Sequence, residues 1–448
     1  MSRFLTSKRL MLIFSVVLIF WATAVFASGD SEGHGSGEVA EVLLGLIVIL
    51  LAAKLGGDMV ERMNQPAVLG ELIIGMIIGN MMLVGVDVFE PFKQSTTLEV
   101  LAEIGVIILL FEVGLESSIG EMMKVGLASF MVATFGVVVP FFLGWGVGVW
   151  FLPHESTYVH IFIGATLTAT SVGITARVLK DIGKIRTREA KIILGAAVID
   201  DIMGLVILAV VAGIISAADG GGVLSSGGIL IIVAKAVGFV VAALALGHYL
   251  SPRVFKFGSK MQVKGMLLTL ALLICFTLAY LANMIGLAPI VGAFAAGLIL
   301  DRVHYKTYTD RGEKGVDELI APIAAFLVPI FFVRMGMMVD MSTFGQLNIL
   351  FFAGVLSFAA ILGKQVCSLA IFDKSINRIA IGLGMIPRGE VGLIFAGIGA
   401  KLMYDGKAIV SGGTFSAVVI MVIITTLVTP PFLKLSMLRG DKNKAKQE

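Results

Sequence analysis

Thirteen apolar segments, most of them close to 20 residues long, follow one another between residues 39 and 435. An α-helix needs about 20 consecutive apolar residues to cross the hydrocarbon core of a bilayer. The pattern therefore predicts an all-α polytopic membrane protein with thirteen transmembrane helices. The predicted spans are 39 to 60, 66 to 84, 98 to 116, 123 to 152, 157 to 179, 188 to 215, 228 to 250, 264 to 284, 287 to 300, 316 to 338, 344 to 364, 376 to 400 and 411 to 435.

Composition supports this class and narrows the functions. Of the 448 residues, 58% are hydrophobic and 15% are charged, and the mean hydropathy is +1.00, which is far outside the range of soluble domains. The net charge of +3 comes largely from Lys and Arg in the connecting loops, so we expect a lipid membrane and no nucleic acid as partner. Cys275 and Cys367 lie in apolar segments, and we expect no disulfide framework, structural metal site or cofactor.

The N-terminus has the layout of a secretory signal peptide. Arg3, Lys8 and Arg9 precede an apolar run, and small residues end this run at Ala27, before a polar, Gly-rich stretch. We predict that residues 1–27 are a signal peptide cleaved after Ala27, and an uncleaved anchor is the alternative. Residue 38 emerges outside the cell in either case.

The basic loops indicate the orientation. When the first helix starts outside, the Lys- and Arg-rich connections after the fifth, seventh, ninth and eleventh segments all fall on one side, which is the cytoplasm. The connections on the other side carry almost no Lys or Arg. An odd number of helices then leaves the short tail, residues 436–448, in the cytoplasm and the mature N-terminus outside.

Two segments are poorly suited to a continuous helix. The fifth, IFIGATLTATSVGITARVL, is crowded with Thr, Ser and Gly, and the twelfth has Pro387 at its centre, followed by Arg388 and Glu390. Proline lacks a backbone donor and breaks the helical ladder. The alternative is that the hydroxyl groups bond back to their own helix and that Pro387 makes only a kink.

The positions of these two segments predict an internal repeat. They lie seven crossings apart, so one runs inward and the other outward. We therefore predict two inverted repeats with two discontinuous crossing helices: residues 39–215 form the first half, 228–250 a linker helix and 264–435 the second half. Interrupted helices at matching positions of inverted halves indicate a binding site near the midplane of the bilayer.

Asp200 and Asp201 lie in the middle of the sixth segment, within GAAVIDDIMGLVILAVVAGIIS. A charge at bilayer depth costs about 2.5 to 3.5 kcal/mol on insertion scales, so such groups are usually functional. Because neighbouring helical residues point roughly 100 degrees apart, the two carboxylates cannot share one partner. We expect a fixed cation, Arg334 of the tenth segment, to hold one of them while the other faces a water-filled cavity. That second carboxylate can hold a proton, or release it and take a dehydrated cation, which is antiport in its minimal form.

At these residues the chain resembles a known family. The Asp-Asp pair, the TATSVGIT break before it and the PRGEVGL break near the end are similar to those of bacterial sodium/proton antiporters of the NapA-like type, within the monovalent cation/proton antiporter superfamily. The resemblance covers residues 39 to 435. It implies a homodimer in the bacterial inner membrane and an elevator-like motion, in which a core domain carrying the broken helices moves against a dimerisation domain.

The resemblance also implies roles for individual residues. Asp201 would bind the transported cation and the proton, and Asp200 would contribute to this site while pairing with a basic residue of the tenth segment. The crossover of the broken helices would be formed by Thr168, Ser171, Thr175, Pro387, Arg388 and Glu390.

Arg334 departs from the pattern of electrogenic relatives, which carry Lys on the tenth segment. An Arg there is typical of electroneutral relatives that have Asn-Asp in place of Asp-Asp. Lysine can lose its proton when buried, whereas arginine effectively cannot. A permanent pair of Asp200 with Arg334 would leave only Asp201 to cycle. This favours one-for-one exchange, and the stoichiometry stays open between the electroneutral and electrogenic forms.

The predicted function is secondary active antiport of protons against sodium or lithium, and not an enzymatic reaction. A potassium/proton antiporter or potassium efflux transporter of the same superfamily is the nearest alternative, because all three cations take oxygen ligands. An organic-anion/sodium symporter would share the inverted repeat, but the acidic pair and Arg388 with Glu390 fit small ions better. An intramembrane aspartyl protease needs its two carboxylates on two helices, so the adjacency of Asp200 and Asp201 argues against it.

Overall fold

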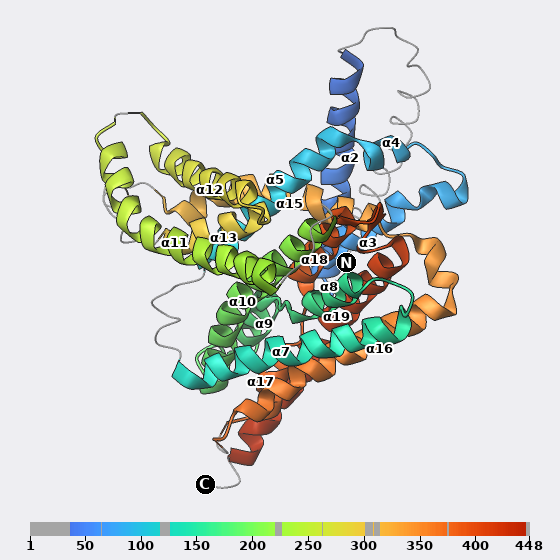
Figure 1. Ribbon diagram of the computed structural model, residues 1–448, viewed down its shortest axis with the longest axis vertical. Helices are drawn as coiled ribbons and strands as arrows, with labels where there is room; N and C mark the ends of the chain where they lie inside the picture. The colour runs from blue at the N-terminus through green and yellow to red at the C-terminus, as the bar shows by residue number, and fades with distance from the viewer. Residues whose placement is uncertain are drawn as a thin grey trace, which may run out of the picture.

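Helices follow the apolar segments from one end of the chain to the other (Figure 1). The computed structural model describes residues 36–444 except for 64, 117–125, 220–225, 262, 301–307, 309–313 and 374–375. The predicted signal peptide, residues 1–27, lies outside the described residues. The longer helices are α2 (Ser36–Glu61), α3 (Ala67–Gly79), α5 (Thr96–Glu116), α7 (Gly126–Phe151), α8 (Thr157–Thr168), α9 (Val172–Asp181), α10 (Arg188–Asp219), α11 (Ser226–Gly258), α12 (Met266–Met284), α13 (Pro289–Ile299), α15 (Val316–Met337), α16 (Leu347–Val366), α18 (Gly389–Lys401) and α19 (Gly412–Lys444).

Shorter elements complete the described part of the chain. They are the helices α4 (Glu90–Gln94) and α17 (Arg378–Gly384), the 3-10 turns η1 (Met81–Val84), η3 (Met341–Gly345) and η4 (Cys367–Ala370), and the antiparallel strands β1 (Met403–Tyr404) and β2 (Lys407–Ala408).

Each of the thirteen predicted segments contains at least one helix. Within the described ranges, nine helices are long and apolar enough to cross a membrane. The other four segments are helical but differ from a plain span: α3 and α13 are short, α5 carries several glutamates, and the twelfth segment is divided into α17 and α18. The prediction of an all-α polytopic membrane protein is confirmed, and the crossing number of thirteen stays a prediction.

The helices pack in two bundles, which occupy the lower and upper parts of the view in Figure 1. The crossing bundle consists of α7, α8, α9, α10, α16, α17, α18 and α19, and the flanking bundle consists of α2, α3, α5, α12, α13 and α15. The long helix α11 contacts α10 in the first bundle and α12 and α13 in the second. Each bundle therefore takes helices from both predicted halves of the chain, and α11, which contains the predicted linker 228–250, contacts both bundles. The inverted symmetry itself stays a prediction.

Glycines allow the helices of the flanking bundle to pack backbone against backbone. A Cβ at Gly75 of α3 would fall on the carbonyl of Val333 in α15, and a Cβ at Gly336 of α15 would fall on the carbonyl of Leu72 in α3. Membrane helices associate through close packing of small residues because lipid gives no hydrophobic driving force between them. The contact between α3 and α15 is thus sterically fixed in this bundle.

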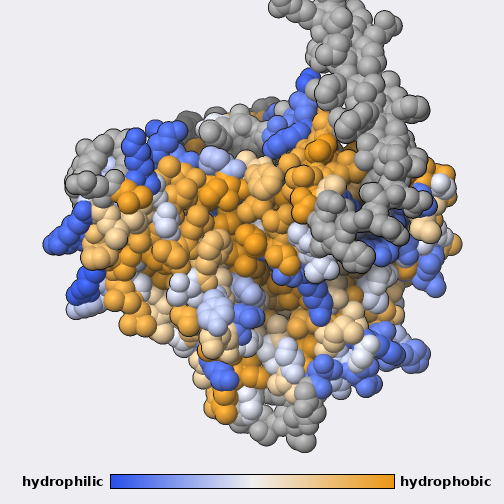
Figure 2. Space-filling view, turned by 90° about the horizontal axis from the view of Figure 1, so that it is seen from above, coloured by the Kyte–Doolittle hydropathy of each residue, from blue (hydrophilic) through white to orange (hydrophobic). Residues whose placement is uncertain are grey.

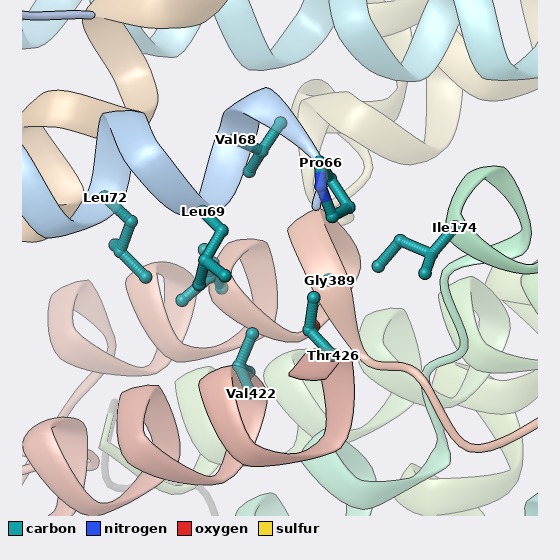
Figure 3. A pocket seen from close by; sticks show the side chains of 9 residues that line it. Pro66, Val68, Leu69, Leu72, Ile174, Gly389, Val422 and Thr426 are labelled. Carbon is teal, nitrogen blue, oxygen red and sulfur yellow. The ribbon is translucent and has the colours of Figure 1, made fainter. Parts of the chain in front are cut away.

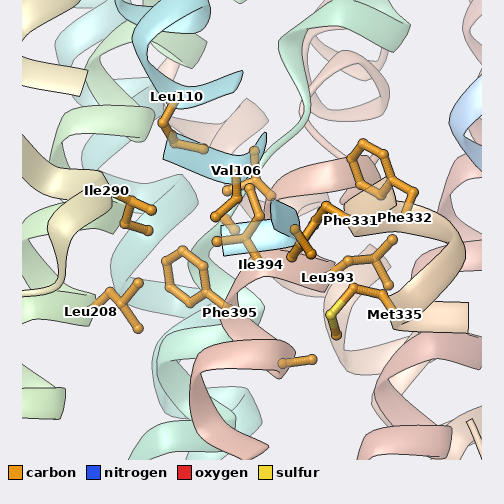
Figure 4. Packing of buried hydrophobic residues seen from close by; sticks show 14 of the residues in the cluster. Val106, Leu110, Leu208, Ile290, Phe331, Phe332, Met335, Leu393, Ile394 and Phe395 are labelled. Atoms are coloured by element: carbon orange, nitrogen blue, oxygen red, sulfur yellow. The ribbon is translucent and has the colours of Figure 1, made fainter. Parts of the chain in front are cut away.

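Apolar side chains fill the junction at which α18 of the crossing bundle meets the flanking bundle (Figure 4). The gathered side chains are Leu393, Ile394 and Phe395 of α18, Val106 and Leu110 of α5, and Phe331, Phe332 and Met335 of α15. A junction of this kind holds the bundles together by non-directional packing rather than by hydrogen bonds.

The surface of the molecule is apolar over much of its width. Figure 2 shows hydrophobic residues across the middle of one face and hydrophilic residues gathered toward its edges. Large exposed side chains such as Phe142, Trp150, Val241 and Phe351 contribute to the apolar surface of the described helices. Soluble proteins rarely expose contiguous apolar patches of more than a few hundred Å², so this surface fits a lipid environment.

Candidate functional site

The two interrupted segments meet at their interruptions. In the first, α8 ends at Thr168 and α9 begins at Val172. In the second, α17 ends at Gly384 and α18 begins at Gly389. The amide of Ser171 donates a hydrogen bond of 2.7 Å to the carbonyl of Pro387, so the backbone of one break is bonded directly to the other. Both breaks occur where the sequence predicted them, and their residues form a crossing of four half-helices.

Glycine is required at the closest approach within this crossing. Gly389 has a φ of +44°, and a Cβ at this position would lie 2.6 Å from the Cβ of Ser171. Glycine adopts positive φ values at no steric cost and leaves room for a neighbouring backbone. The preceding Pro387 has no amide hydrogen to leave unsatisfied in the break. The local sequence Pro387-Arg388-Gly389 therefore accounts for both the break and the contact.

Hydroxyl groups of α8 and α9 bind carbonyls released by the breaks. Thr175 donates to the Gly384 carbonyl at 2.6 Å, and Thr170 donates to the Met385 carbonyl at 3.3 Å. Thr168 instead donates to Ala165 in its own helix at 2.7 Å. Polar groups within a membrane must be satisfied internally, so Thr170 and Thr175 stabilise the end of α17.

Arg388 lies at the centre of the crossing and is fully buried. Its guanidinium donates hydrogen bonds to the carbonyl of Ala169, just beyond the end of α8, and to the carbonyl of Ala360 in α16 at 3.2 Å. A helix C-terminus carries a partial negative charge, which a cation stabilises. Arg388 therefore compensates the end of α8. Glu390 is in the first turn of α18, and its side chain lies outside the described part of the structure.

Asp200 forms a buried ion pair with Lys364. Both side chains are 0% exposed, and the Nζ of Lys364 lies 2.7 Å from Oδ1 of Asp200. Gly136 of α7 passes beside the pair, since a Cβ there would lie 3.5 Å from the Lys364 Nζ. The pair is adjacent to the crossing, because Thr170 and the charge of Arg388 lie near the carboxylate of Asp200.

Asp201 follows on the same helix and is also buried. One turn further on, a Cβ at Gly204 would lie 3.8 Å from the Thr168 hydroxyl and 3.9 Å from the ring of Phe395 in α18. This part of α10 therefore packs against the end of α8 and against α18. The structure brings Asp200 and Asp201 together with Thr168, Ser171, Thr175, Pro387 and Arg388 in the crossing bundle.

The prediction that Arg334 is the counter-charge of Asp200 is wrong. Arg334 lies in α15 of the flanking bundle, where its Nη2 is 3.2 Å from Oε2 of Glu99 and its Nη1 donates to the carbonyls of Phe92 and Ser95. Lysine supplies the positive charge at Asp200 instead. The inference of one-for-one exchange from a permanent arginine pair therefore loses its basis.

Lys364 was missed because the predicted eleventh span ended at that residue, where a lysine is expected to reach the membrane surface. The helix α16 continues to Val366, and η4 then runs to Ala370. The apolar sequence that follows Lys364, QVCSLAIF, is the feature from which the burial of this lysine could have been predicted. It places the lysine well inside an apolar segment.

Glu99 also links the two bundles. Lys401, the last residue of α18, lies 2.7 Å from Oε1 of Glu99 and forms a second ion pair with Glu103 of the same helix. Glu99 thus contacts Arg334 within its own bundle and Lys401 from the other. These side chains are partly exposed, so each pair contributes only about 0 to 1 kcal/mol to stability.

The chemistry of the buried site suits small cations. Two carboxylates and the carbonyls of the breaks offer oxygen atoms, which monovalent cations prefer, and a carboxylate also binds a proton. Among the described residues, no group of three His, Cys, Asp or Glu side chains could hold a metal ion. The two carboxylates are chemically suited to bind exchangeable ions.

Sequence comparison identifies the family to which this site belongs. Residues 46–436 match the transmembrane sodium/hydrogen exchangers. The chain belongs to the sodium/hydrogen exchanger family. The resemblance inferred from the Asp-Asp pair and the two breaks is therefore confirmed at the level of the family.

Two relatives within the family are similar over almost their whole length. The high-affinity Na⁺/H⁺ antiporter NhaS3 of Synechocystis is 39% identical over 430 residues, which cover 88% of this chain and 90% of NhaS3. The Na⁺/H⁺-K⁺ antiporter GerN of Bacillus cereus is 35% identical over 411 residues, covering 90% of this chain and 98% of GerN.

A solved structure has a similar fold. The sodium/proton antiporter MjNhaP1 of Methanocaldococcus jannaschii at pH 8 superimposes with a TM-score of 0.66, covering 90% of this chain and 98% of its own. The sequences are 17% identical, so this likeness concerns the fold alone.

Proposed function

We propose that the protein exchanges sodium ions for protons across the membrane, with Asp201 as the group that binds both. The observation that carries this proposal is the buried Asp200–Lys364 pair beside the crossing of two broken helices, with a second carboxylate one residue away. The names of NhaS3 and GerN support sodium and protons as the exchanged ions. The potassium in the name of GerN makes potassium the second cation to test.

Exchange follows from competition for the same carboxylates. A buried carboxylate without its proton needs a compensating charge, and a partly dehydrated sodium ion supplies one. Protonation removes that need and releases the cation. In this proposal Asp201 binds either a sodium ion or a proton, but not both at once. Because the site crosses the membrane with one of these ions bound, the flow of sodium is coupled to the flow of protons.

The lysine partner favours exchange that moves net charge. When the cation binds the carboxylate oxygens of Asp200, this carboxylate attracts the Lys364 ammonium group less strongly. That attraction is what keeps Lys364 protonated. Lysine can then lose its proton, which an arginine could not do. We infer that Asp201 and Lys364 both release protons on cation binding, so that more than one proton crosses for each sodium ion.

An elevator-like movement of the crossing bundle is the mechanism that we infer for access to both sides. The apolar junction at α18 and the contacts of α11 with both bundles are compatible with sliding of one bundle against the other (Figure 4). In this proposal the flanking bundle forms a homodimer interface, and the inverted halves 39–215 and 264–435 together with the linker helix 228–250 give thirteen crossings. The protein then lies in the bacterial inner membrane, with the mature N-terminus outside after signal-peptide cleavage and the tail 436–448 in the cytoplasm.

The function is tested by cation-dependent collapse of a proton gradient in everted membrane vesicles. Sodium, lithium and potassium are added in turn to vesicles that contain wild type, Asp201→Asn or the control Asp58→Asn, whose carboxylate is partly exposed on α2 and pairs with Arg62. We expect sodium-driven exchange in wild type and in the control, and its loss in Asp201→Asn. Exchange by Asp201→Asn at the wild-type rate would overturn the assignment. An imposed membrane voltage should change the wild-type rate, and a rate independent of voltage would contradict the charge-moving form.

A further inference from the structure

A small cavity lies between the two bundles, directly against the crossing. Leu69 and Leu72 of α3 line one side, and Val422 and Thr426 of α19 line the opposite side, with Ile174 of α9 nearby (Figure 3). Gly389, at the start of α18, also lines the cavity and packs against Ser171. The cavity is therefore bounded on one side by the flanking bundle and on the other by the break that adjoins the aspartates.

Thr426 is the single polar side chain among the described residues that line this cavity. It is 3% exposed, and its hydroxyl has no hydrogen-bond partner in the described structure. Its neighbours behave differently: Thr429 donates to the Thr425 carbonyl at 2.8 Å, and Thr425 donates to the Met421 carbonyl at 2.9 Å. Membrane threonines usually bond back to their own helix in this way.

The two adjacent threonines differ in where their hydroxyl groups lie. The Thr425 hydroxyl, which has one hydrogen to donate, lies 2.9 Å from the Met421 carbonyl and 3.0 Å from the Val422 carbonyl of its own helix. The Thr426 hydroxyl is left in an apolar cavity, where a polar group without a partner is unfavourable. We therefore expect a molecule or ion that enters the cavity to bind the Thr426 hydroxyl when the protein is in its membrane.

The size of the cavity limits what can enter. Its volume is about 20 Å³, and a void needs roughly 10 to 15 Å³ to hold one water molecule. A hydroxyl can donate to water, and its oxygen can accept from water or bind a cation. A single water, or a small monovalent cation in its place, fits both the volume and the polarity.

We propose that Thr426 is a water- and cation-contacting residue of the route between the cytoplasm and Asp201. This inference rests on the exchange function proposed above, and it adds a residue of α19 to the residues that contact the transported ion. The route enters between α3 and α19, passes the Thr426 hydroxyl and reaches the crossing at Gly389. The other side chains along this part of the route are apolar. The Thr426 hydroxyl is therefore the group that replaces part of the water shell of the ion.

The first test compares three variants in everted vesicles, in which sodium reaches the cytoplasmic face. Thr426→Val removes the hydroxyl with little change of shape, Thr426→Ser keeps it, and Thr425→Val is the matched control on the same turn of α19. We expect Thr426→Val to raise the KM for sodium about threefold to tenfold, the loss of one ordinary hydrogen bond. Thr426→Ser and Thr425→Val should stay within about twofold of wild type. The inference is overturned if Thr426→Val also stays within that range, if Thr425→Val raises the KM equally, or if Thr426→Ser does not restore it.

The second test does not depend on transport. In a chain whose buried Cys275 and Cys367 are replaced by alanine, Thr426→Cys and Thr425→Cys are treated from the cytoplasmic face with silver ion, a thiol-reactive monovalent cation small enough to enter the cavity. We expect the cysteine at 426 to react at least about tenfold faster than the one at 425, because only the former faces the cavity. Equal rates, or no reaction at 426, would refute the route. If wild type and Thr425→Val show no sodium-dependent exchange at all, the proposed function fails, whereas normal exchange in Thr426→Val defeats only this inference.

Discussion

Replacing Lys364 by Met removes one partner of a buried ion pair while keeping the length of the side chain. Asp200 and Lys364 are both 0% exposed, and Oδ2 of Asp200, the oxygen that does not bind Lys364, has no hydrogen-bond partner within the described residues. Removing one partner from such a pair typically costs about 3 to 5 kcal/mol, because the remaining charge is buried without compensation. We therefore expect Lys364→Met to lower the free energy of unfolding by about this amount.

The double variant Asp200→Asn/Lys364→Met separates loss of the pair from loss of packing. It has no buried charge at either position, so it should regain most of the stability lost in Lys364→Met. A double-mutant cycle in mixed micelles measures this coupling as the departure of the double variant from the sum of the single variants. Lys235→Met is the control, since Lys235 is exposed on α11. The reasoning is refuted if the double variant is no more stable than Lys364→Met, or if Lys235→Met loses as much stability.

Two further predictions concern the contacts of α18. Gly389→Ala should lower the free energy of unfolding by about 1 to 3 kcal/mol. The Cβ of the alanine would meet Ser171, and the φ of +44° at this position disfavours a side chain. Thermal unfolding in detergent measures this loss. Gly173→Ala is the control, since a Cβ there meets nothing within 4 Å, and equal stability of the two variants would contradict the close crossing. Lys401→Gln removes the ion pairs to Glu99 and Glu103, so the free energy of unfolding should change by less than about 2 kcal/mol. The exchange rate should become less sensitive to ionic strength than in wild type or in the control Lys407→Gln. An unchanged salt dependence would show that the two bundles are not coupled through these charges.

The apolar segments and the breaks were predictable because they depend on local chemistry. A run of about 20 apolar residues indicates a membrane helix by itself. Pro387 removes a backbone donor, and the flanking Arg388 and Glu390 distinguish it from Pro140 and Pro329, which lie inside continuous helices. Family resemblance added the meaning of the Asp-Asp pair. These features required no knowledge of which helices become neighbours.

The partners of the buried charges were not predictable in the same way. Arg334 and Lys364 both follow apolar sequence near the end of a predicted segment, and the choice between them depends on which helix packs beside α10. The Arg388–Ala169 and Ser171–Pro387 contacts involve backbone atoms, which leave no mark on residue identity. Thr425 and Thr426 are adjacent and of the same residue type, and only the structure shows that the Thr425 hydroxyl bonds within its own helix while Thr426 lines the cavity.

The crossing also constrains how the protein can be made. Arg388 and Ala169 are 219 positions apart in the chain, so the fifth segment enters the membrane long before the residues that complete it. Until then, the carbonyls at the end of α8 and the amide of Ser171 lack their native partners in a setting where unsatisfied backbone groups cost several kcal/mol. During biosynthesis, the backbone groups at the break of the fifth segment therefore stay without their native hydrogen bonds. The ion site forms only when the twelfth segment has been inserted.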